Sequence, residues 1–245
     1  MGSLSGNPPR FTPDNVGIVD FGNGYAAKTG TTWEQKGTER RLVFGFTGWQ
    51  EPTAPTGCGR YLIIPRDLSV VSNRLEVSPI PETKVLRVPS SKKITAVEAN
   101  VPMDGSAGTI ASGSQVEISL SCTGTATSGK VAVRTLASSD GKYYTEIGYD
   151  FGDKTMPFYV DHSRCCTTPN TIVQKAISGG AQSSLSNMTV LVDGGLIEAY
   201  AVGTVITPLL NPDEAAGGAP EARQTTVVNT ATGVKCEVES YMLKY

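Results

Sequence analysis

The 245-residue sequence has little excess charge, a single histidine and no long apolar segment. Charged residues make up 18% of the chain and the formal net charge is −2, so the basic surface that binds nucleic-acid phosphates is missing. No run of about 18 apolar residues occurs, as a membrane-spanning helix would need. Residues 1–15 carry no apolar stretch of the kind found in a signal peptide. We therefore expect neither nucleic acid nor a membrane as a partner.

Clusters of metal ligands are also missing. His162 is the single histidine, and none of the five cysteines falls in a Cys-x-x-Cys spacing. Because a zinc site needs clustered Cys and His ligands, we expect no metal and no cofactor. The cysteines are expected to be mostly buried or half-buried thiols rather than a disulfide framework. Neighbouring residues of a strand point to opposite faces, so no bond is expected between Cys165 and Cys166.

Short β-rich runs dominate the sequence, and segments with a helical period are nearly absent. In residues 116–121, Val, Ile and Leu alternate with Glu and Ser, which is the pattern of a half-buried antiparallel strand. Many short strands separated by turns are typical of sandwiches, barrels and propeller blades. The expected fold class is therefore all-β. The β-rich runs lie at residues 40–46, 60–71, 114–122, 130–138, 143–151, 156–163, 188–202, 225–230 and 234–243.

Residues 78–92 divide the chain. Three prolines, a Ser-Ser pair and a short helical segment at 80–87 mark this stretch as a linker. Residues 93–245 are long enough for an antiparallel two-sheet β-sandwich. Residues 16–77 have room for only about four strands, too few to close a core of their own, and are expected to be part of something larger. Residues 1–15 are expected to be a disordered N-terminal segment.

The stretch DFGNGYAAKTG, residues 20–30, is similar to the D-Y-G-N-F-Y-A-S-K-T-F motif of glycoside hydrolase family 32, the invertases and fructan-processing enzymes. Further stretches resemble that family in the same order, and the resemblance covers the chain from residue 16 onward. They are RRLVFGFTGW at 40–49, GCGRYLIIPRDLSV at 57–70, LEVSPIPETKVLR at 75–87, FYVDHSRCC at 158–166, MTVLVDGGLIEAYAV at 188–202 and NTATGVKCEVESYML at 229–243.

The resemblance implies a five-bladed β-propeller followed by a β-sandwich. Residues 16–77 would then be a fragment of the last blade, and residues 93–245 the sandwich. The implied chemistry is retaining hydrolysis, or transfer, of β-fructofuranosyl units of sucrose or fructans. In such a reaction one carboxylate attacks the anomeric carbon and a second protonates the leaving group. The family's usual location, extracellular or vacuolar, is implied as well.

The family carries its catalytic acids in W-x-N-D-P-N-G, E-C and R-D-P motifs, and none of these occurs here. We therefore expect no catalytic residue in this chain, which resembles the C-terminal portion of a family 32 enzyme. By itself it is expected to be inactive, and to need an N-terminal catalytic part before it meets sucrose or a fructan.

The resemblance places the loop at residues 20–28 at the border of the substrate funnel. There Asp20 can accept hydrogen bonds from sugar hydroxyls, Tyr25 can pack on the apolar face of a sugar, and Lys28 can donate to hydroxyls. The residues alone also allow an ordinary turn, in which Asp20 starts the turn and the glycines after it supply the positive φ.

Three other stretches have plainer interpretations. Residues 161–164 combine an acid, an imidazole and a hydroxyl, but adjacent strand residues point to opposite faces, so we expect a structural strand end. Glu198 has no acidic partner nearby in the sequence and is expected to be structural or an interdomain contact. Residues 187–189, Asn-Met-Thr, form a glycosylation sequon that matters if the chain is secreted.

Three functions stay open at this point. The first is the C-terminal part of a β-fructofuranosidase-type hydrolase. The second is a stand-alone, non-catalytic sugar-binding or partner-binding β-sandwich. The third is a subunit that completes a catalytic half encoded elsewhere. The second would be favoured by exposed aromatic side chains on one face of the sandwich. The candidates are Tyr143, Tyr144, Tyr149, Phe151, Phe158 and Tyr159.

Overall fold

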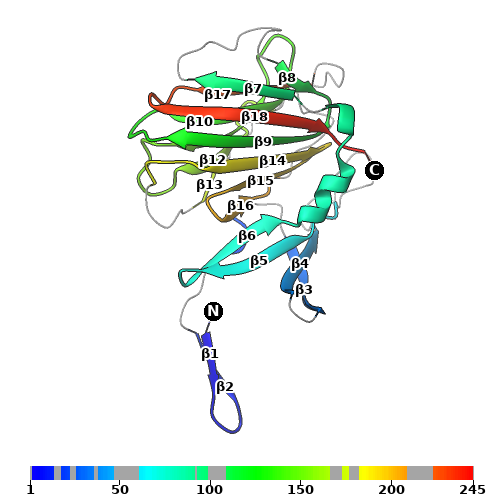
Figure 1. Ribbon diagram of the computed structural model, residues 1–245, viewed down its shortest axis with the longest axis vertical. Coiled ribbons are helices and arrows are strands. Elements are labelled where there is room, and N and C mark those ends of the chain that lie inside the picture. The colour runs from blue at the N-terminus through cyan, green and yellow to red at the C-terminus, as the bar shows by residue number, and fades with distance from the viewer. Residues whose placement is uncertain are drawn as a thin grey trace.

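A computed structural model describes residues 2–13, 18–22, 26–35, 38–46, 61–91, 93–98, 109–165, 173–176, 182–208 and 223–244. For residues 26–35, 38–39, 93–96 and 98 it describes the backbone alone. The chain folds into a β-sandwich, a smaller four-stranded sheet beside it and an N-terminal hairpin (Figure 1). The all-β fold class predicted from the sequence is confirmed.

The sandwich consists of two six-stranded antiparallel sheets. The smaller four-stranded sheet is called the blade, and the sandwich sheet that contacts it is called the blade-facing sheet. Its strands, in spatial order, are β16 (Thr204–Ile206), β15 (Leu196–Ala201), β14 (Asn187–Asp193), β9 (Gln115–Gly124), β18 (Val234–Met242) and β7 (Lys93–Glu98). The distal sheet contains β13 (Val173–Ala176), β12 (Phe158–Asp161), β11 (Thr145–Asp150), β10 (Lys130–Ala137), β17 (Gln224–Asn229) and β8 (Thr109–Ser112).

The main core lies between these two sheets and follows the predicted alternation. Val116, Ile118 and Leu120 of β9 point into it and are at most 1% exposed. The residues between them, Glu117 and Ser119, lie on the outer face of the blade-facing sheet. Because the side-chain period of a strand is two, one face of β9 fills the core and the other is available to contact a second layer.

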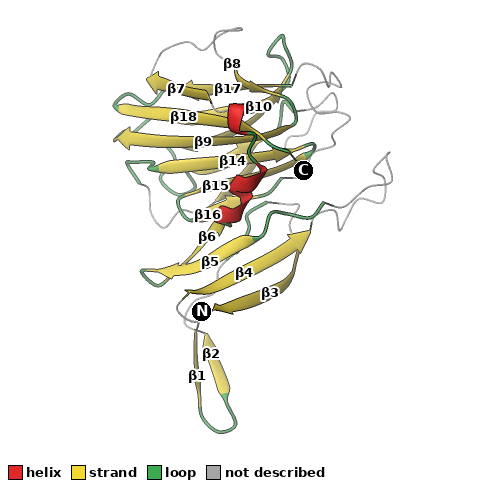
Figure 2. Ribbon diagram, turned by 45° about the vertical axis from the view of Figure 1, so that its right-hand side comes forward, coloured by secondary structure: helices red, strands yellow, loops and turns green. Residues whose placement is uncertain are grey.

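The smaller sheet has the strand order β3 (Ala26–Gln35), β4 (Thr38–Phe46), β5 (Arg66–Val71) and β6 (Arg74–Pro79), and every neighbouring pair is antiparallel. This sheet is the blade (Figure 2). Ser72 and Asn73 turn the chain between β5 and β6 with φ values of 49° and 61°. Two consecutive positive φ angles are typical of the tight hairpin turns that match the twist of paired strands.

The linker runs from the blade to the sandwich as two short 3-10 helices, η1 (Pro81–Leu86) and η2 (Pro89–Ser91), drawn red in Figure 2. The short helix predicted at residues 80–87 is thus confirmed. Arg87, which follows η1, donates to both carboxylate oxygens of Glu117 on the blade-facing sheet, and its guanidinium lies over the Tyr241 ring. The linker is therefore fastened to the sandwich by a buried carboxylate.

The N-terminal segment differs from the disorder that the sequence led us to expect. β1 (Gly2–Ser5) and β2 (Arg10–Pro13) form an antiparallel hairpin in which Leu4 lies directly opposite Phe11. Gly6, with φ of 89°, begins the turn between them. Local turn chemistry and this cross-strand apolar pair support the hairpin without help from a core. Both side chains are exposed.

The expectation of mostly free thiols was wrong for three cysteines. Cys122 and Cys236 form a disulfide across 114 residues of chain, between strands β9 and β18. They lie directly opposite each other in the strand register, a relationship that the sequence spacing does not reveal. Cys165 is disulfide-bonded as well. Its partner lies outside the described residues, as does Cys166, so the predicted absence of a Cys165–Cys166 bond stays a prediction.

In the part of the chain that the structure describes, no helix has the length and apolar character needed to cross a membrane. The same residues contain no group of three or more His, Cys, Asp or Glu side chains that could hold a metal ion.

Candidate functional site

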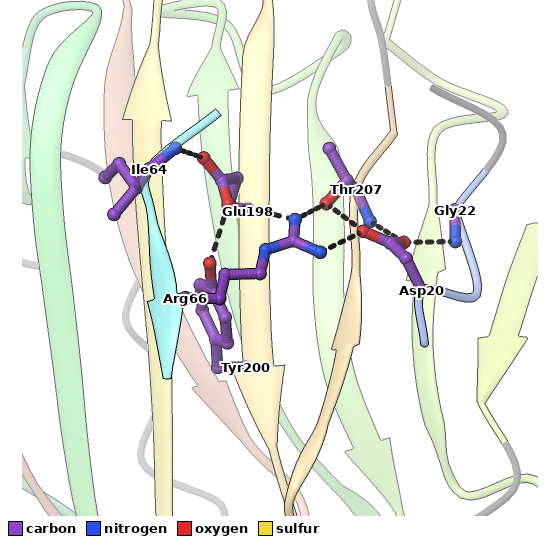
Figure 3. Close-up of polar contacts among 7 residues, drawn as sticks. All are labelled: Asp20, Gly22, Ile64, Arg66, Glu198, Tyr200 and Thr207. Atoms are coloured by element: carbon purple, nitrogen blue, oxygen red, sulfur yellow. Dashed lines mark hydrogen bonds and ion pairs between the residues drawn. The ribbon is translucent and has the colours of Figure 1, made fainter. Parts of the chain in front are cut away.

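A buried polar network around Arg66 lies where the blade meets the sandwich (Figure 3). Arg66 is the first residue of β5 and is 0% exposed. Its Nη1 atom lies 2.8 Å from Oδ2 of Asp20, and its Nη2 atom lies 3.0 Å from Oε2 of Glu198. Nη2 also lies 2.7 Å from Oγ1 of Thr207. One guanidinium thus joins the blade to the segment around Asp20 and to the sandwich.

The Asp20 carboxylate is held entirely by protein donors. Its Oδ1 accepts from the backbone amides of Gly22 at 2.7 Å and Thr207 at 3.0 Å. Its Oδ2 accepts from Arg66 and from the Thr207 hydroxyl, which lies 2.6 Å away. A carboxylate offers about four acceptor positions. All of them are taken here, so Asp20 has none left for a sugar hydroxyl.

Glu198 occupies the opposite end of the guanidinium. Its Oε1 accepts from the backbone amide of Ile64 at 2.7 Å, and its Oε2 accepts from the Tyr200 hydroxyl at 2.6 Å as well as from Arg66. Arg66 begins β5 of the blade and Ile64 lies just before it, whereas Glu198 and Tyr200 belong to β15 of the sandwich. The prediction that Glu198 is structural or an interdomain contact is therefore confirmed.

The charges of this network are stabilised by one another. Burial disfavours the charged guanidinium, but the acidic groups around Arg66 raise its pKa above the ordinary value, so it remains a cation. Burial raises the pKa of the Tyr200 phenol well above its usual range, so this hydroxyl stays a neutral donor. Burial also raises the pKa of Glu198, an effect that the Arg66 charge and the Tyr200 hydrogen bond oppose.

The alternation of β15 explains how a charged residue reaches this position. Ile197 and Ala199 point into the sandwich core, so Glu198 and Tyr200 must point to the outer face. The blade covers this outer face with a second apolar cluster. Its buried members are Val77, Leu191, Tyr200, Val205 and Leu243, with Val19, Ile64, Leu68 and Leu86 packed against them. The network is thus enclosed by apolar side chains from the blade, the linker and the sandwich.

Backbone hydrogen bonds also join the blade and the segment around Asp20 to the sandwich. The amide of Phe21 donates to the carbonyl of Val205 at 3.0 Å, and the amide of Val77 donates to that of Gly203 at 2.9 Å. Gly22 lies so close to the backbone of Thr207 that a Cβ atom at this position would overlap it. The glycine in the DFGNG stretch is therefore needed for the close approach of the N-terminal segment to the sandwich.

The structure describes the three residues predicted to contact a sugar to different extents. Tyr25 lies outside the described residues, and of Lys28 only the backbone, in β3, is described. The sugar contact predicted for Asp20 finds no support, because its side chain is 0% exposed and saturated with protein donors. The sequence analysis did not identify Arg66 and Thr207 as site residues. A single arginine inside the apolar run LIIPRDL was the signal for Arg66; Thr207 has no comparable signal.

The described residues contain no arrangement suited to glycoside hydrolysis. A retaining enzyme needs two carboxylates that reach the substrate. Asp20 and Glu198 share Arg66, but both are closed off from solvent. The Asp161–Arg164 segment is no triad either, since Asp161 accepts from the backbone amide of Ser163. That the chain carries no catalytic residue stays a prediction.

Most of the candidate aromatic side chains belong to the core. Tyr149, Phe151 and Phe158 are at most 2% exposed, and Tyr159 donates to the buried Glu146 carboxylate at 2.7 Å. Only Tyr143 and Tyr144 are half-exposed, and Lys142, Arg134 and Arg164 lie over their rings. These six residues therefore do not form a flat aromatic platform for sugars.

The comparison with protein families matches the profile described as "Glycosyl hydrolases family 32 C terminal" to residues 82–241. The chain belongs to glycoside hydrolase family 32. The match begins in the linker helix η1 and ends in β18, so it covers the sandwich of a family 32 protein. A comparison with curated protein sequences finds no match.

Solved structures with this fold include an exo-inulinase, a β-fructofuranosidase and a fructan exohydrolase. Exo-inulinase from Aspergillus awamori has a TM-score of 0.69 and 15% identity, over 96% of this chain and 48% of its own. A β-fructofuranosidase from Bombyx mori has a TM-score of 0.69 and 16% identity, over 99% of this chain and 46% of its own. Fructan 1-exohydrolase IIa from Cichorium intybus has a TM-score of 0.70 and 18% identity, over 99% and 54%.

This family 32 chain therefore spans about half the length of the enzymes that it resembles. At these identities the likeness supports the fold alone. It extends across the blade as well as the sandwich, because nearly the whole chain is covered in each comparison. The predicted order, part of a propeller followed by a two-sheet sandwich, is thus confirmed.

Proposed function

We propose that this chain is the C-terminal part of a retaining hydrolase that acts on β-fructofuranosyl linkages of sucrose or fructans. The observation that carries the proposal is a four-stranded blade locked onto a family 32 sandwich by the buried Arg66 network. Related structures were solved with 1-kestose and with sucrose, which supports a fructoside as the ligand class.

In this proposal the chain supports catalysis and does not perform it. The sandwich holds the last blade in place, and the blade completes a propeller whose other blades supply the nucleophile and the acid. Substrate contacts from this chain come from Tyr25 and Lys28, while Asp20 positions the segment that precedes them. We also propose the domain boundaries expected from the sequence, with 16–77 as the last-blade fragment, 78–92 as the linker and 93–245 as the sandwich.

The test is a comparison of the chain alone with the chain preceded by propeller blades that carry the N-D-P-N-G motif, encoded upstream or supplied as a separate subunit. We expect no measurable release of glucose from sucrose or fructose from inulin by the chain alone. Losing either catalytic carboxylate costs several orders of magnitude, at about 1.4 kcal/mol per tenfold, and here both are missing. With the blades present, we expect turnover.

Two outcomes would contradict the proposal. Turnover by the chain alone would mean that acids of this chain do the chemistry assigned to other blades. Tight binding of inulin by the chain alone, unchanged when the blades are added, would favour the stand-alone sugar-binding module. A circular-dichroism spectrum dominated by β-structure serves as the control that the isolated chain is folded.

A further inference from the structure

Asn187 and Thr189 lie on the same face of strand β14 of the sandwich. In β14 the residue between them, Met188, is 0% exposed and points into the core. The strand period therefore places Asn187 and Thr189 together on the outer face, where Asn187 is exposed and Thr189 half-exposed. Asn-Met-Thr is a sequence that oligosaccharide transfer accepts, and no other Asn-x-Ser/Thr stretch with a non-proline centre occurs in the chain.

The position of Asn187 in the sheet leaves its side chain accessible. On one side Asn187 pairs with Ser121 of β9. On the other side the pairing with β15 starts only at Met188, so no strand residue faces Asn187 there. Among the described residues its side-chain amide has no hydrogen-bond partner, which leaves room for a substituent on the nitrogen.

A polar groove of about 570 Å³ opens next to this residue, between the outer face of the blade-facing sheet and the β6–linker segment. Asn187 and Thr189 line one wall, and Ser119 lies beside them on β9. Glu76, Ser78 and Lys84 line the opposite wall. Hydroxyl, carboxylate and ammonium groups of this kind satisfy sugar hydroxyls, which donate and accept at the same time.

The disulfide supplies an independent indication of the compartment. The amide of Cys122 donates to the carbonyl of Ser186, the residue before Asn187, at 2.8 Å, so the bridge and the sequon are adjacent in space. Buried structural disulfides form in oxidising compartments, and proteins that pass through such compartments are the ones that receive N-linked sugars.

We propose that Asn187 is N-glycosylated and that the first sugars of the glycan lie in the groove between the sandwich and the last blade. The glycan would act as a third link across this junction, in addition to the Arg66 network and the linker. This inference does not depend on the proposed enzymatic function, because it concerns a covalent modification of the sandwich.

The first test is production of the chain in a secreting eukaryotic host, followed by intact-mass measurement before and after treatment with peptide N-glycosidase. We expect one glycan, lost in Asn187→Gln and Thr189→Ala and retained in Thr189→Ser. The last two variants change the same half-exposed position, so they separate loss of the sequon from loss of the side chain. A secreted chain with Cys122–Cys236 formed and Asn187 unmodified would overturn the site.

The second test locates the glycan by amide hydrogen exchange before and after its enzymatic removal. We expect faster exchange at residues 76–84 and 117–119 once the glycan is removed, with no change in the distal strands β10 and β11. Equal exchange in the two forms would overturn the placement in the groove. Both readouts are independent of sugar hydrolysis, so failure of the proposed function would leave them interpretable.

Discussion

Asp20 and Arg66 lie 46 residues apart in the chain and form an ion pair in which neither side chain has any exposed area. The Oδ2–Nη1 distance is 2.8 Å. The same guanidinium reaches Glu198, 132 residues farther along the chain. A single buried cation thus compensates two buried carboxylates from opposite sides of the blade–sandwich junction.

The first prediction concerns removal of this cation. Arg66→Met leaves two carboxylates buried without a counter-charge, and breaking a buried pair in this way costs about 3–5 kcal/mol. Arg66→Lys should recover only part of the loss, because an ammonium cannot present the planar fork that reaches both acids. The free energy of unfolding from urea denaturation is the measurement.

The matched control is Arg40→Met. Arg40 makes a similar pair of contacts, to Asp67 and Glu82, but its side chain is 30% exposed. Solvent screens such a pair, so the loss should be much smaller than for Arg66. If both variants lost the same free energy of unfolding, burial would not be what makes the Arg66 network stabilising.

The second prediction concerns Gly22. In Gly22→Ala the added Cβ overlaps the Thr207 backbone, so the N-terminal segment or β16 must shift. We expect a loss of about 1–3 kcal/mol in the free energy of unfolding, as for other overpacked sites. Gly152→Ala is the control, since its Cβ meets only the Asp150 side chain. A Gly22 variant as stable as the control would contradict the close approach.

The third prediction concerns the Cys122–Cys236 bridge. It closes a loop of 114 residues, and the chain-entropy account gives about 4–5 kcal/mol for a loop of this length. The Cys122→Ala/Cys236→Ala double variant should lower the urea midpoint accordingly. The bridge formed by Cys165 remains intact in this variant, so the two contributions are separated. An unchanged midpoint would mean that the unfolded variant has no more conformational freedom than the unfolded chain with the bridge.

The fourth prediction concerns acid sensitivity through His162. This side chain is 0% exposed, and among the described residues neither ring nitrogen has a hydrogen-bond partner. Burial lowers the pKa of His162, and the nearby Asp161 charge opposes the effect. The unfolded chain therefore binds a proton from about pH 6.5 downward, where the folded chain does not yet bind one.

Stability supplied by the neutral imidazole should be complete above about pH 6.5 and should fall progressively below it, down to the lowered folded-state pKa. His162→Leu removes the titrating group, so its free energy of unfolding should vary less between pH 7 and 5.5. The measurement is urea denaturation of both proteins across that range. Parallel pH profiles would show that another group causes the dependence.

Local patterns in the sequence determined much of the architecture. The alternation in residues 116–121 correctly predicted which side of β9 fills the core, because a strand has a fixed side-chain period of two. The prolines around residues 80–87 correctly predicted a short connecting helix, because proline restricts φ and removes a backbone donor. These are properties of neighbouring residues and need no knowledge of the fold.

Only the tertiary structure decided the roles of Asp20, Arg66 and Cys122. Asp20 looked like a ligand contact and is a buried counter-ion, and Cys122 looked like a thiol and is a disulfide. A buried charge needs an opposite charge, and a cysteine needs a second sulfur within reach, but the fold brings these partners together from more than 40 residues away. The residue type shows that a buried charge or a cysteine can require a partner. Which residue becomes that partner depends on how distant segments of the chain pack together.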